Sequence, residues 1–195
     1  MVAINPQTIE GNWLRGVALD FHTVSSVFLG YNQHGDAEFD TRRSEIGELL
    51  YRLKYRRDET AAPEIIAAAA GFLKRHREKL DLMIPVPPSA VRSVQPVLIL
   101  ARGIGHELGL PVVSCVTTTR TTTQLKSVSE PEERTRLLSG LYAVDAGHTT
   151  NKHVLLFDDL YRSGATMNAI TDLLLGQGHA ASVRALTITR TRVRQ

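Results

Sequence analysis

The chain has 195 residues, enough for one domain with a buried core, and its 43% hydrophobic and 22% charged residues are typical of globular proteins. No run of about 18 apolar residues occurs, and the first 25 residues lack a basic head followed by an apolar segment, so we expect a cytoplasmic protein with no membrane span. Cys115 is the only cysteine, which excludes an internal disulfide and a multi-cysteine zinc site, and the net charge of +3 is modest.

The N-terminal part favours β-structure. From Trp13 to Phe39, β-branched and aromatic residues alternate with turn formers such as Gly30 and Gly35, which predicts two or three short antiparallel strands. We expect one domain over 1–195, with a β-rich appendage at 1–40 and a core at 41–195.

The next segments predict helices and the first part of a parallel sheet. Apolar residues at helical spacing predict an amphipathic helix over 44–57, and an alanine-rich segment predicts a second helix over 63–79. A short apolar run at 80–86 is typical of a central strand, a helix is expected at about 93–108, and a further strand at 111–116. Strand, helix and strand in this order form the repeating unit of a parallel sheet.

The C-terminal half continues the alternation. Residues 117–129 are polar without an apolar face and predict a mobile loop, followed by a short helix from about 129 to 140. A buried strand is expected at 153–157, a helix at 165–175 and a final strand at 182–189. The fold class is therefore α/β, with a central, mainly parallel sheet flanked by helices.

The stretch LLFDDLYRSGATMNAI carries the clearest functional signal. A buried strand delivers Asp158 and Asp159 to the carboxyl edge of the predicted sheet, where open α/β folds place their ligands. The turn Arg162–Thr166 enters a helix, so its free N–H groups and the hydroxyls of Ser163 and Thr166 form an anion site. Carboxylates suit hydroxyl donors and an N–H nest suits a phosphate, and a sugar 5-phosphate presents both.

Three alternative roles for this stretch are less favoured. The two aspartates could cap the following turn, but two in sequence beside an anion site exceed what capping needs. A receiver-like phosphoacceptor domain needs a further aspartate and a lysine on later strands, and the pair lies too near the C-terminus for these. A Walker-type nucleotide site is excluded, because no G-x-x-x-x-G-K-[ST] sequence occurs.

The stretch DDLYRSGAT resembles the signature of type I phosphoribosyltransferases, in which two acidic residues follow an apolar strand and precede a phosphate loop. The resemblance implies that Asp158 and Asp159 hold the ribose hydroxyls of phosphoribosyl pyrophosphate. It also implies that Arg162, Ser163, Gly164, Ala165 and Thr166 cradle the 5-phosphate.

The same resemblance implies which residues contact the pyrophosphate and which metal is bound. The loop in MIPVPPSAVR is similar to the family's pyrophosphate loop, which implies contacts from Pro88, Ser89, Ala90 and Arg92. Mg²⁺ is implied as the cofactor, bound mainly through substrate phosphates near the two aspartates, with no direct protein ligand. The polar loop at 117–129 is a candidate lid in which Lys126 would assist catalysis; a surface loop with incidental basic residues is the alternative.

Over most of its length the chain resembles the ComF-type phosphoribosyltransferases, which are associated with competence for DNA uptake. The pieces LYRLKYRRD, IPVPPSAVRSVQP, a threonine-rich segment and FDDLYRSGAT occur in the same order. Two features depart from that family: the cysteine-rich zinc segment and an R-G-F-N-Q-like stretch are missing, so we expect no zinc. Arg162 cannot act as a general base, which argues against a hypoxanthine or guanine acceptor.

Three functions remain open from the sequence. The first is an enzyme that transfers a phosphoribosyl group to a nitrogenous acceptor, and the second is a non-catalytic binding or adaptor protein of DNA uptake or processing. The third is a nucleic-acid-binding protein, because basic residues cluster at 52–57 and because Arg190, Arg192 and Arg194 would share a face of an extended strand. A solvated basic edge explains the same arginines, and a homodimer is also compatible with the sequence.

Overall fold

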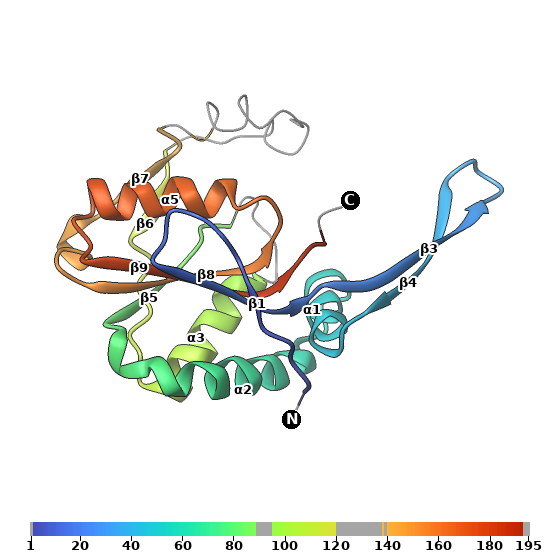
Figure 1. The fold of residues 1–195 in the computed structure, drawn as a ribbon, viewed down its shortest axis with the longest axis horizontal. Coiled ribbons are helices and arrows are strands. Elements are labelled where there is room, and N and C mark those ends of the chain that lie inside the picture. Colours follow the sequence, from blue (N-terminus) through green and yellow to red (C-terminus); the bar gives the residue numbers. More distant parts are fainter. Residues whose placement is uncertain (1, 89–94, 120–137, 139, 193–195) are drawn as a thin grey trace.

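The computed structural model describes residues 2–88, 95–119, 138 and 140–192, and its centre is a five-stranded sheet (Figure 1). The strands run in the order β1-β2-β9-β8-β5, with the bounds Gln7–Thr8, Arg15–Phe21, Ser182–Arg190, His153–Tyr161 and Leu82–Pro85. β1 and β2 are antiparallel, and the other neighbouring pairs are parallel. The predicted α/β class with a mainly parallel sheet is confirmed.

Helices cover both faces of this sheet. One face carries α5, and the opposite face carries α1, α2 and α3 (Figure 1). Their bounds, from α1 to α3 and then α5, are Glu45–Tyr55, Ala62–Leu73, Pro96–Leu108 and Ala165–Gly176. Short 3-10 turns occur at Glu59–Ala61, Lys74–Lys79 and Ala146–His148. None of the described helices combines the length and the apolar composition needed to cross a bilayer.

The helix ends follow from local sequence signals. The Ser44 side chain caps α1 by accepting a hydrogen bond from the Gly47 N–H at 3.1 Å, and Gly109 ends α3 with a left-handed φ of 57°. The predicted second helix is shorter than expected, because α2 ends at Leu73 and the segment at 74–79 is a 3-10 turn. That segment, KRHREK, has no apolar side chain to bury, so the sheet gives it no support as an α-helix.

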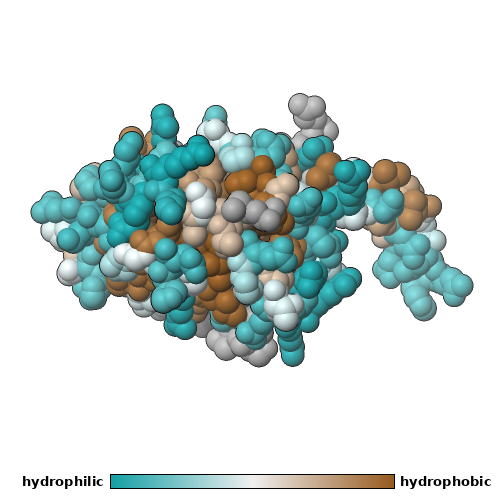
Figure 2. Space-filling view, turned by 90° about the horizontal axis from the view of Figure 1, so that it is seen from below, coloured by the Kyte–Doolittle hydropathy of each residue, from teal (hydrophilic) through white to brown (hydrophobic). Residues whose placement is uncertain are grey.

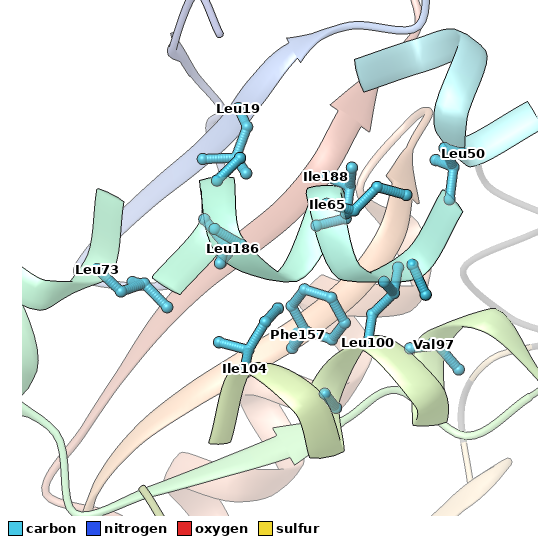
Figure 3. Close-up of a cluster of buried hydrophobic side chains, with 14 of the residues drawn as sticks. Leu19, Leu50, Ile65, Leu73, Val97, Leu100, Ile104, Phe157, Leu186 and Ile188 are labelled. Atoms are coloured by element: carbon cyan, nitrogen blue, oxygen red, sulfur yellow. The ribbon is translucent and has the colours of Figure 1, made fainter. Parts of the chain in front are cut away.

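Two hydrophobic cores lie on the two faces of the sheet. Between the sheet and α1 to α3, Phe157 and Leu186 from the strands meet helix residues such as Ile65, Leu100 and Ile104 (Figure 3). Between the sheet and α5, a second cluster joins a different set of strand residues to Met167, Ile170 and Leu174 of the helix. Because both faces are covered, the buried segments Leu82–Pro85 of β5 and 154–157 of β8 are continuous apolar runs, as the sequence predicts.

The N-terminal appendage is smaller than the range 1–40 predicted from the sequence. Strand β2 pairs in parallel with β9 inside the main sheet, with Ala18 opposite Thr187. The following hairpin, β3 (Thr23–Tyr31) and β4 (Ala37–Arg43), projects from the body (Figure 1). Ala18 and Leu19 are fully buried, one in each core, so tertiary packing draws this strand into the sheet.

The strand predicted at 111–116 does not form as such. Only Val112 makes an isolated parallel bridge, and the two backbone bonds there run from Met83 N–H to the Pro111 carbonyl and from Val113 N–H to the Met83 carbonyl. Strand β5 ends at Pro85, and Pro87 follows without an N–H group, so a longer ladder has few partners. Instead, β6 (Val116–Thr118) pairs antiparallel with β7 (Tyr142–Val144).

Candidate functional site

The two aspartates lie within a strand rather than after it. Strand β8 continues to Tyr161, four residues beyond the predicted end, so Asp158 and Asp159 point to opposite faces of the sheet. Leu156, two residues before Asp158, packs in the core under α5, whereas Phe157 packs in the core under α1 to α3. Asp158 therefore faces α5 and Asp159 faces α1.

Asp158 shares a pocket with the predicted phosphate turn. The pocket has a volume of about 90 Å³, and its lining consists of Asp158, Leu160, Tyr161, Arg162, Ser163, Gly164, Ala165, Thr166 and Met167. A carboxylate and the start of α5 thus meet in one concave surface. The structure brings together six of the predicted site residues, which are Asp158 and the five residues of the turn.

The turn before α5 has the backbone geometry of an anion site. Gly164 caps the helix with a left-handed φ of 75°, and the first N–H groups of a helix have no carbonyl partner within it. A Cβ atom at this position would lie 2.8 Å from the Tyr161 hydroxyl oxygen, so the ring leaves room only for glycine. Tyr161 is itself held, because its hydroxyl donates to the Glu10 carbonyl at 3.0 Å.

The environment of Asp158 disfavours the ionised form of its carboxyl group. Burial raises its pKa to about 7, with a contribution from the charge of Asp159, while the Asp159 N–H and Lys54 oppose the shift. The Asp159 N–H donates to Asp158 Oδ1 at 2.8 Å. A carboxyl group that titrates near neutral pH accepts hydroxyl donors well once it has lost its proton.

Asp159 is bound by a residue that the sequence did not single out for the site. Lys54 of α1 places its Nζ 2.8 Å from both Oδ1 and Oδ2 of Asp159, and both side chains are largely buried. Lys54 follows Ile46 and Leu50 at intervals of four, on the helix face that packs against the sheet. A lysine in register with a buried apolar stripe is the signal that could have identified it.

The rest of the basic cluster at 52–57 has different environments. Arg52 forms an ion pair with Asp58 at 2.6 Å, and Arg56 and Arg57 are exposed. The cluster is therefore not one continuous basic surface, because Lys54 and Arg52 are engaged within the chain.

His22 is a second residue that the sequence did not identify. It follows β2 and its Nδ1 lies 3.2 Å from Thr189 Oγ1. Burial lowers its pKa to about 4, with contributions from the positive charges of Arg43, Lys54 and Arg162, while Asp159 opposes them. A neutral imidazole thus lies within electrostatic reach of Asp159 and the phosphate turn.

The predicted pyrophosphate loop begins at the same edge of the sheet. The Val86 N–H donates to the Phe157 carbonyl at 2.8 Å, so the chain leaves the sheet for Pro88 beside the strand that carries Asp158. Ser89, Ala90 and Arg92 lie outside the described residues, and so do Lys126 and most of the 117–129 loop. Their assigned roles stay predictions.

Two of the three C-terminal arginines are described, and Arg190 and Arg192 both place their Cζ atoms over the Phe21 ring, at 5.8 Å and 4.9 Å from its centroid, so the stripe of three stays a prediction. Arg190, at the end of β9, donates from Nη1 to the Thr8 carbonyl at 2.8 Å, and its Cζ lies 5.8 Å from the ring centroids of both Phe21 and Tyr161. Arg192 lies beyond the strand, and Arg194 is outside the described residues. Arg190 therefore packs against Tyr161, which lines the pocket, and is not simply a solvent-exposed side chain.

Sequence similarity links the chain to a competence protein of Bacillus subtilis. No family model matches the chain. It is 29% identical over 154 residues to competence protein ComFC of Bacillus subtilis (strain 168), a match that covers 74% of this chain and 59% of ComFC. The chain thus spans about 59% of that relative's length.

Solved structures with a similar fold include phosphoribosyltransferases. A crystal structure of adenine phosphoribosyltransferase superposes with a TM-score of 0.51 at 13% identity, covering 82% of each chain. The adenine phosphoribosyltransferase of Trypanosoma brucei, solved with AMP, pyrophosphate and ribose 5-phosphate, gives a TM-score of 0.46 at 14% identity and covers 94% of this chain and 73% of its own. The chain has the type I phosphoribosyltransferase fold, and the predicted resemblance to ComF-type proteins is confirmed.

Proposed function

We propose that this chain binds phosphoribosyl pyrophosphate together with Mg²⁺ and transfers the phosphoribosyl group to a nitrogenous acceptor. The observation that carries the proposal is the pocket in which Asp158 and the turn Arg162–Thr166 meet. Asp158 accepts the ribose hydroxyls, and the N–H groups and hydroxyls of the turn bind the 5-phosphate. Both ends line the same pocket, so one sugar phosphate can contact both.

Asp159 has a different role in this proposal from that of Asp158. Both of its oxygens accept hydrogen bonds from Lys54, although each retains a further lone pair. A ribose hydroxyl that approaches Asp159 therefore shares the carboxylate with Lys54. We assign the first contact with the sugar to Asp158 and the fixing of the strand end to Asp159.

The residues present fit a magnesium ion that is held mainly by the ligand. Mg²⁺ keeps several waters and binds one or two carboxylates plus substrate phosphates, and Asp158 offers one carboxylate in the pocket. Among the described residues no group of three or more histidine, cysteine or acidic side chains could hold a metal by itself. When bound, Mg²⁺ neutralises charge on the leaving pyrophosphate.

The chemical step needs little from the protein beyond position and charge. The acceptor nitrogen forms a bond to the anomeric carbon, the bond from that carbon to the pyrophosphate oxygen breaks with its electron pair, and the acceptor loses a proton. Asp158 and the helix start hold the ribose by its hydroxyls and by its 5-phosphate, so that the anomeric carbon has a fixed position for the acceptor.

A second function fits the similarity to a competence protein. An adaptor that binds phosphoribosyl pyrophosphate without turnover needs the same pocket but no acceptor site. ComFC is named a competence protein, and the match covers 59% of its length. This similarity supports a role in DNA uptake or processing as the alternative.

Calorimetric titration with phosphoribosyl pyrophosphate and Mg²⁺ tests the proposal. We expect heat of binding with the wild type, a loss of at least about tenfold in affinity for Asp158→Asn, and no change for Asp36→Asn, which replaces an exposed carboxylate of the hairpin. Absence of binding by the folded wild type would exclude both functions that use the ligand.

Pyrophosphate release then separates the enzyme from the adaptor. The wild type is assayed with a panel of purine, pyrimidine and amine acceptors, in the presence of Mg²⁺. Release with one acceptor class, lost in Asp158→Asn, supports transfer; binding without release across the panel supports the adaptor.

A further inference from the structure

The hairpin formed by β3 and β4, residues 23–43, is an arm that projects from the body of the protein (Figure 1). Within the described part of the chain, its two strands pair only with each other. An isolated two-stranded hairpin is marginally stable in water, because neither face is covered. An arm of this length therefore gains stability from whatever covers it.

The arm exposes a concentration of large apolar side chains (Figure 2). The rings of Phe28, Tyr31 and Phe39 form a cluster, with centroids 5.3 Å apart for Phe28 and Tyr31 and 5.5 Å for Phe28 and Phe39. These side chains are 50%, 74% and 48% exposed, and Val27 and Leu29 are 58% and 65% exposed. Exposed apolar patches of this kind mark contact surfaces.

The two edges of the arm differ in their protection. Strand β4 carries four charged residues that hinder pairing with another strand, whereas β3 has none; the four are Glu38, Asp40, Arg42 and Arg43. Register irregularities lie at both ends of β3, between Thr23 and Ser25 and between Phe28 and Gly30, and the pairing from Ser25 to Phe28 is regular. The middle of β3 is thus an uncharged, open edge.

We propose that β3 is the contact between two copies of this chain, which pair antiparallel through their β3 edges and join the two arms into one four-stranded sheet. The strand order in that sheet is β4-β3, followed by β3 and β4 of the second copy. This interface is independent of the pocket and of its ligand.

The charge distribution of the arm favours a second copy in this orientation. The arm is acidic toward its tip, with Asp36, Glu38 and Asp40, and basic at its base, with Arg42 and Arg43. In the joined sheet these charges lie on the two outer β4 strands, so no like charges meet at the contact between the two β3 strands, and antiparallel pairing keeps the acidic tips of the two copies at opposite ends. Antiparallel pairing through β4 would instead place Asp40, the middle residue of that strand, beside Asp40 of the second copy.

The two-fold symmetry also extends the aromatic surface. A two-fold axis perpendicular to the joined sheet keeps the same face of each arm on the same side, so the two aromatic clusters become one continuous face. The open N–H and C=O groups of β3 gain partners, and Val27 and Leu29 lose part of their contact with water on the other face.

Sedimentation velocity over a range of protein concentrations tests the proposal with a matched pair of variants. We expect the wild type to dimerise and Leu29→Lys to dissociate at least about tenfold more readily, because a lysine at the edge opposes pairing. Leu14→Lys is the control: Leu14 is 63% exposed, close to the 65% of Leu29, but lies before β2 on the body. Circular dichroism checks that both variants are folded.

A crosslink locates the contact. In a Cys115→Ser background, which removes the only cysteine, Val27→Cys is expected to form an intermolecular disulfide and Leu14→Cys is not. A wild type that stays monomeric at all concentrations overturns the proposal, and the exposed arm would then be a contact surface for a different protein. A dimer that survives Leu29→Lys but is lost in Leu14→Lys also overturns it, because the interface then lies on the body.

Discussion

Lys54 and Asp159 are 105 residues apart in sequence, and their side chains form a bidentate ion pair between α1 and the end of β8, with both N–O distances at 2.8 Å. This pair ties the helix that leaves the arm to the strand that carries the acidic motif. It also makes the two aspartates unequal, because Asp159 is neutralised by a partner and Asp158 is left facing the pocket. In a buried ion pair the cost of desolvation offsets much of the attraction, but removal of one partner leaves an uncompensated buried charge.

Removal of Lys54 is expected to be costly. Lys54→Met leaves a buried carboxylate without its partner, which costs about 3 kcal/mol of unfolding free energy at neutral pH. The measurement is urea unfolding of this variant and of Lys79→Met, which replaces an exposed lysine and is expected to stay within about 0.5 kcal/mol of the wild type.

The double variant completes that experiment. Adding Asp159→Asn to Lys54→Met removes the unpaired charge and is expected to recover part of the lost stability. Equal stability of Lys54→Met and the wild type would contradict a structural role for the ion pair.

The sequence predicts the features of the site that are local. Asp158 and the turn at 162–166 lie within nine residues, so one strand, one turn and one helix suffice to bring them together. The contact between Lys54 and Asp159 depends on how α1 packs on the sheet, and no local pattern contains that information. The only trace in sequence is the interval of four from Leu50 to Lys54.

The position of β2 was missed for a similar reason. Its sequence, RGVALDF, is compatible with a small antiparallel unit or with a parallel strand, because strand propensity does not name the partner. The parallel pairing with β9, with Arg15 opposite Arg184 and Phe21 opposite Arg190, joins the two ends of the chain. Contacts of such sequence separation follow from the whole fold and not from one segment.

Ligand affinity is expected to rise with pH through neutrality. Burial, followed by the charge of Asp159, raises the pKa of Asp158 to about 7, and the ionised carboxylate accepts hydrogen bonds from hydroxyl groups more strongly than the protonated carboxyl does. Between about pH 6 and about pH 8 the ionised fraction rises roughly tenfold, and the apparent affinity for phosphoribosyl pyrophosphate with Mg²⁺ should rise by a similar factor. Calorimetry at several pH values measures this change.

Asp158→Asn is the control, because phosphate groups themselves titrate near about pH 6. A pH profile that is unchanged in this variant would assign the dependence to the ligand.

The same pKa shift of Asp158 makes an independent prediction for the pH dependence of the unfolding free energy. The folded pKa lies above the ordinary value of 3.8, so this group stabilises the fold below about pH 4, and the contribution is lost as the pH rises to about 7.

Gly164 is expected to be irreplaceable at the phosphate turn. Gly164→Ala places a Cβ 2.8 Å from the Tyr161 hydroxyl oxygen in a backbone with a φ of 75°, so the turn has to shift. We expect a loss of about 1–2 kcal/mol in unfolding free energy and weaker binding of inorganic phosphate. Thermal unfolding with and without phosphate measures both.

The matched control lies at the far end of the same helix. A Cβ at Gly176 would meet nothing within 4 Å, so Gly176→Ala is expected to leave phosphate binding unchanged and to stabilise the helix by up to about 1 kcal/mol. Equal phosphate binding by both variants would show that the turn does not form the anion site.

Arg190 and Arg192 distinguish support of the pocket from contact with nucleic acid. Both guanidinium groups lie over the Phe21 ring, but Arg190 is half-buried, also lies over the Tyr161 ring and donates to the Thr8 carbonyl at 2.8 Å, whereas Arg192 is exposed. Arg190→Met is therefore expected to lower the unfolding free energy by about 1–2 kcal/mol, and Arg192→Met by less than about 0.5 kcal/mol.

DNA binding at several salt concentrations is measured for the same two variants. A nucleic-acid stripe would make each substitution lower the affinity similarly and reduce the salt dependence by about one ion, with stability unchanged. Unequal stability with unchanged DNA affinity is the outcome that the contacts of Arg190 predict.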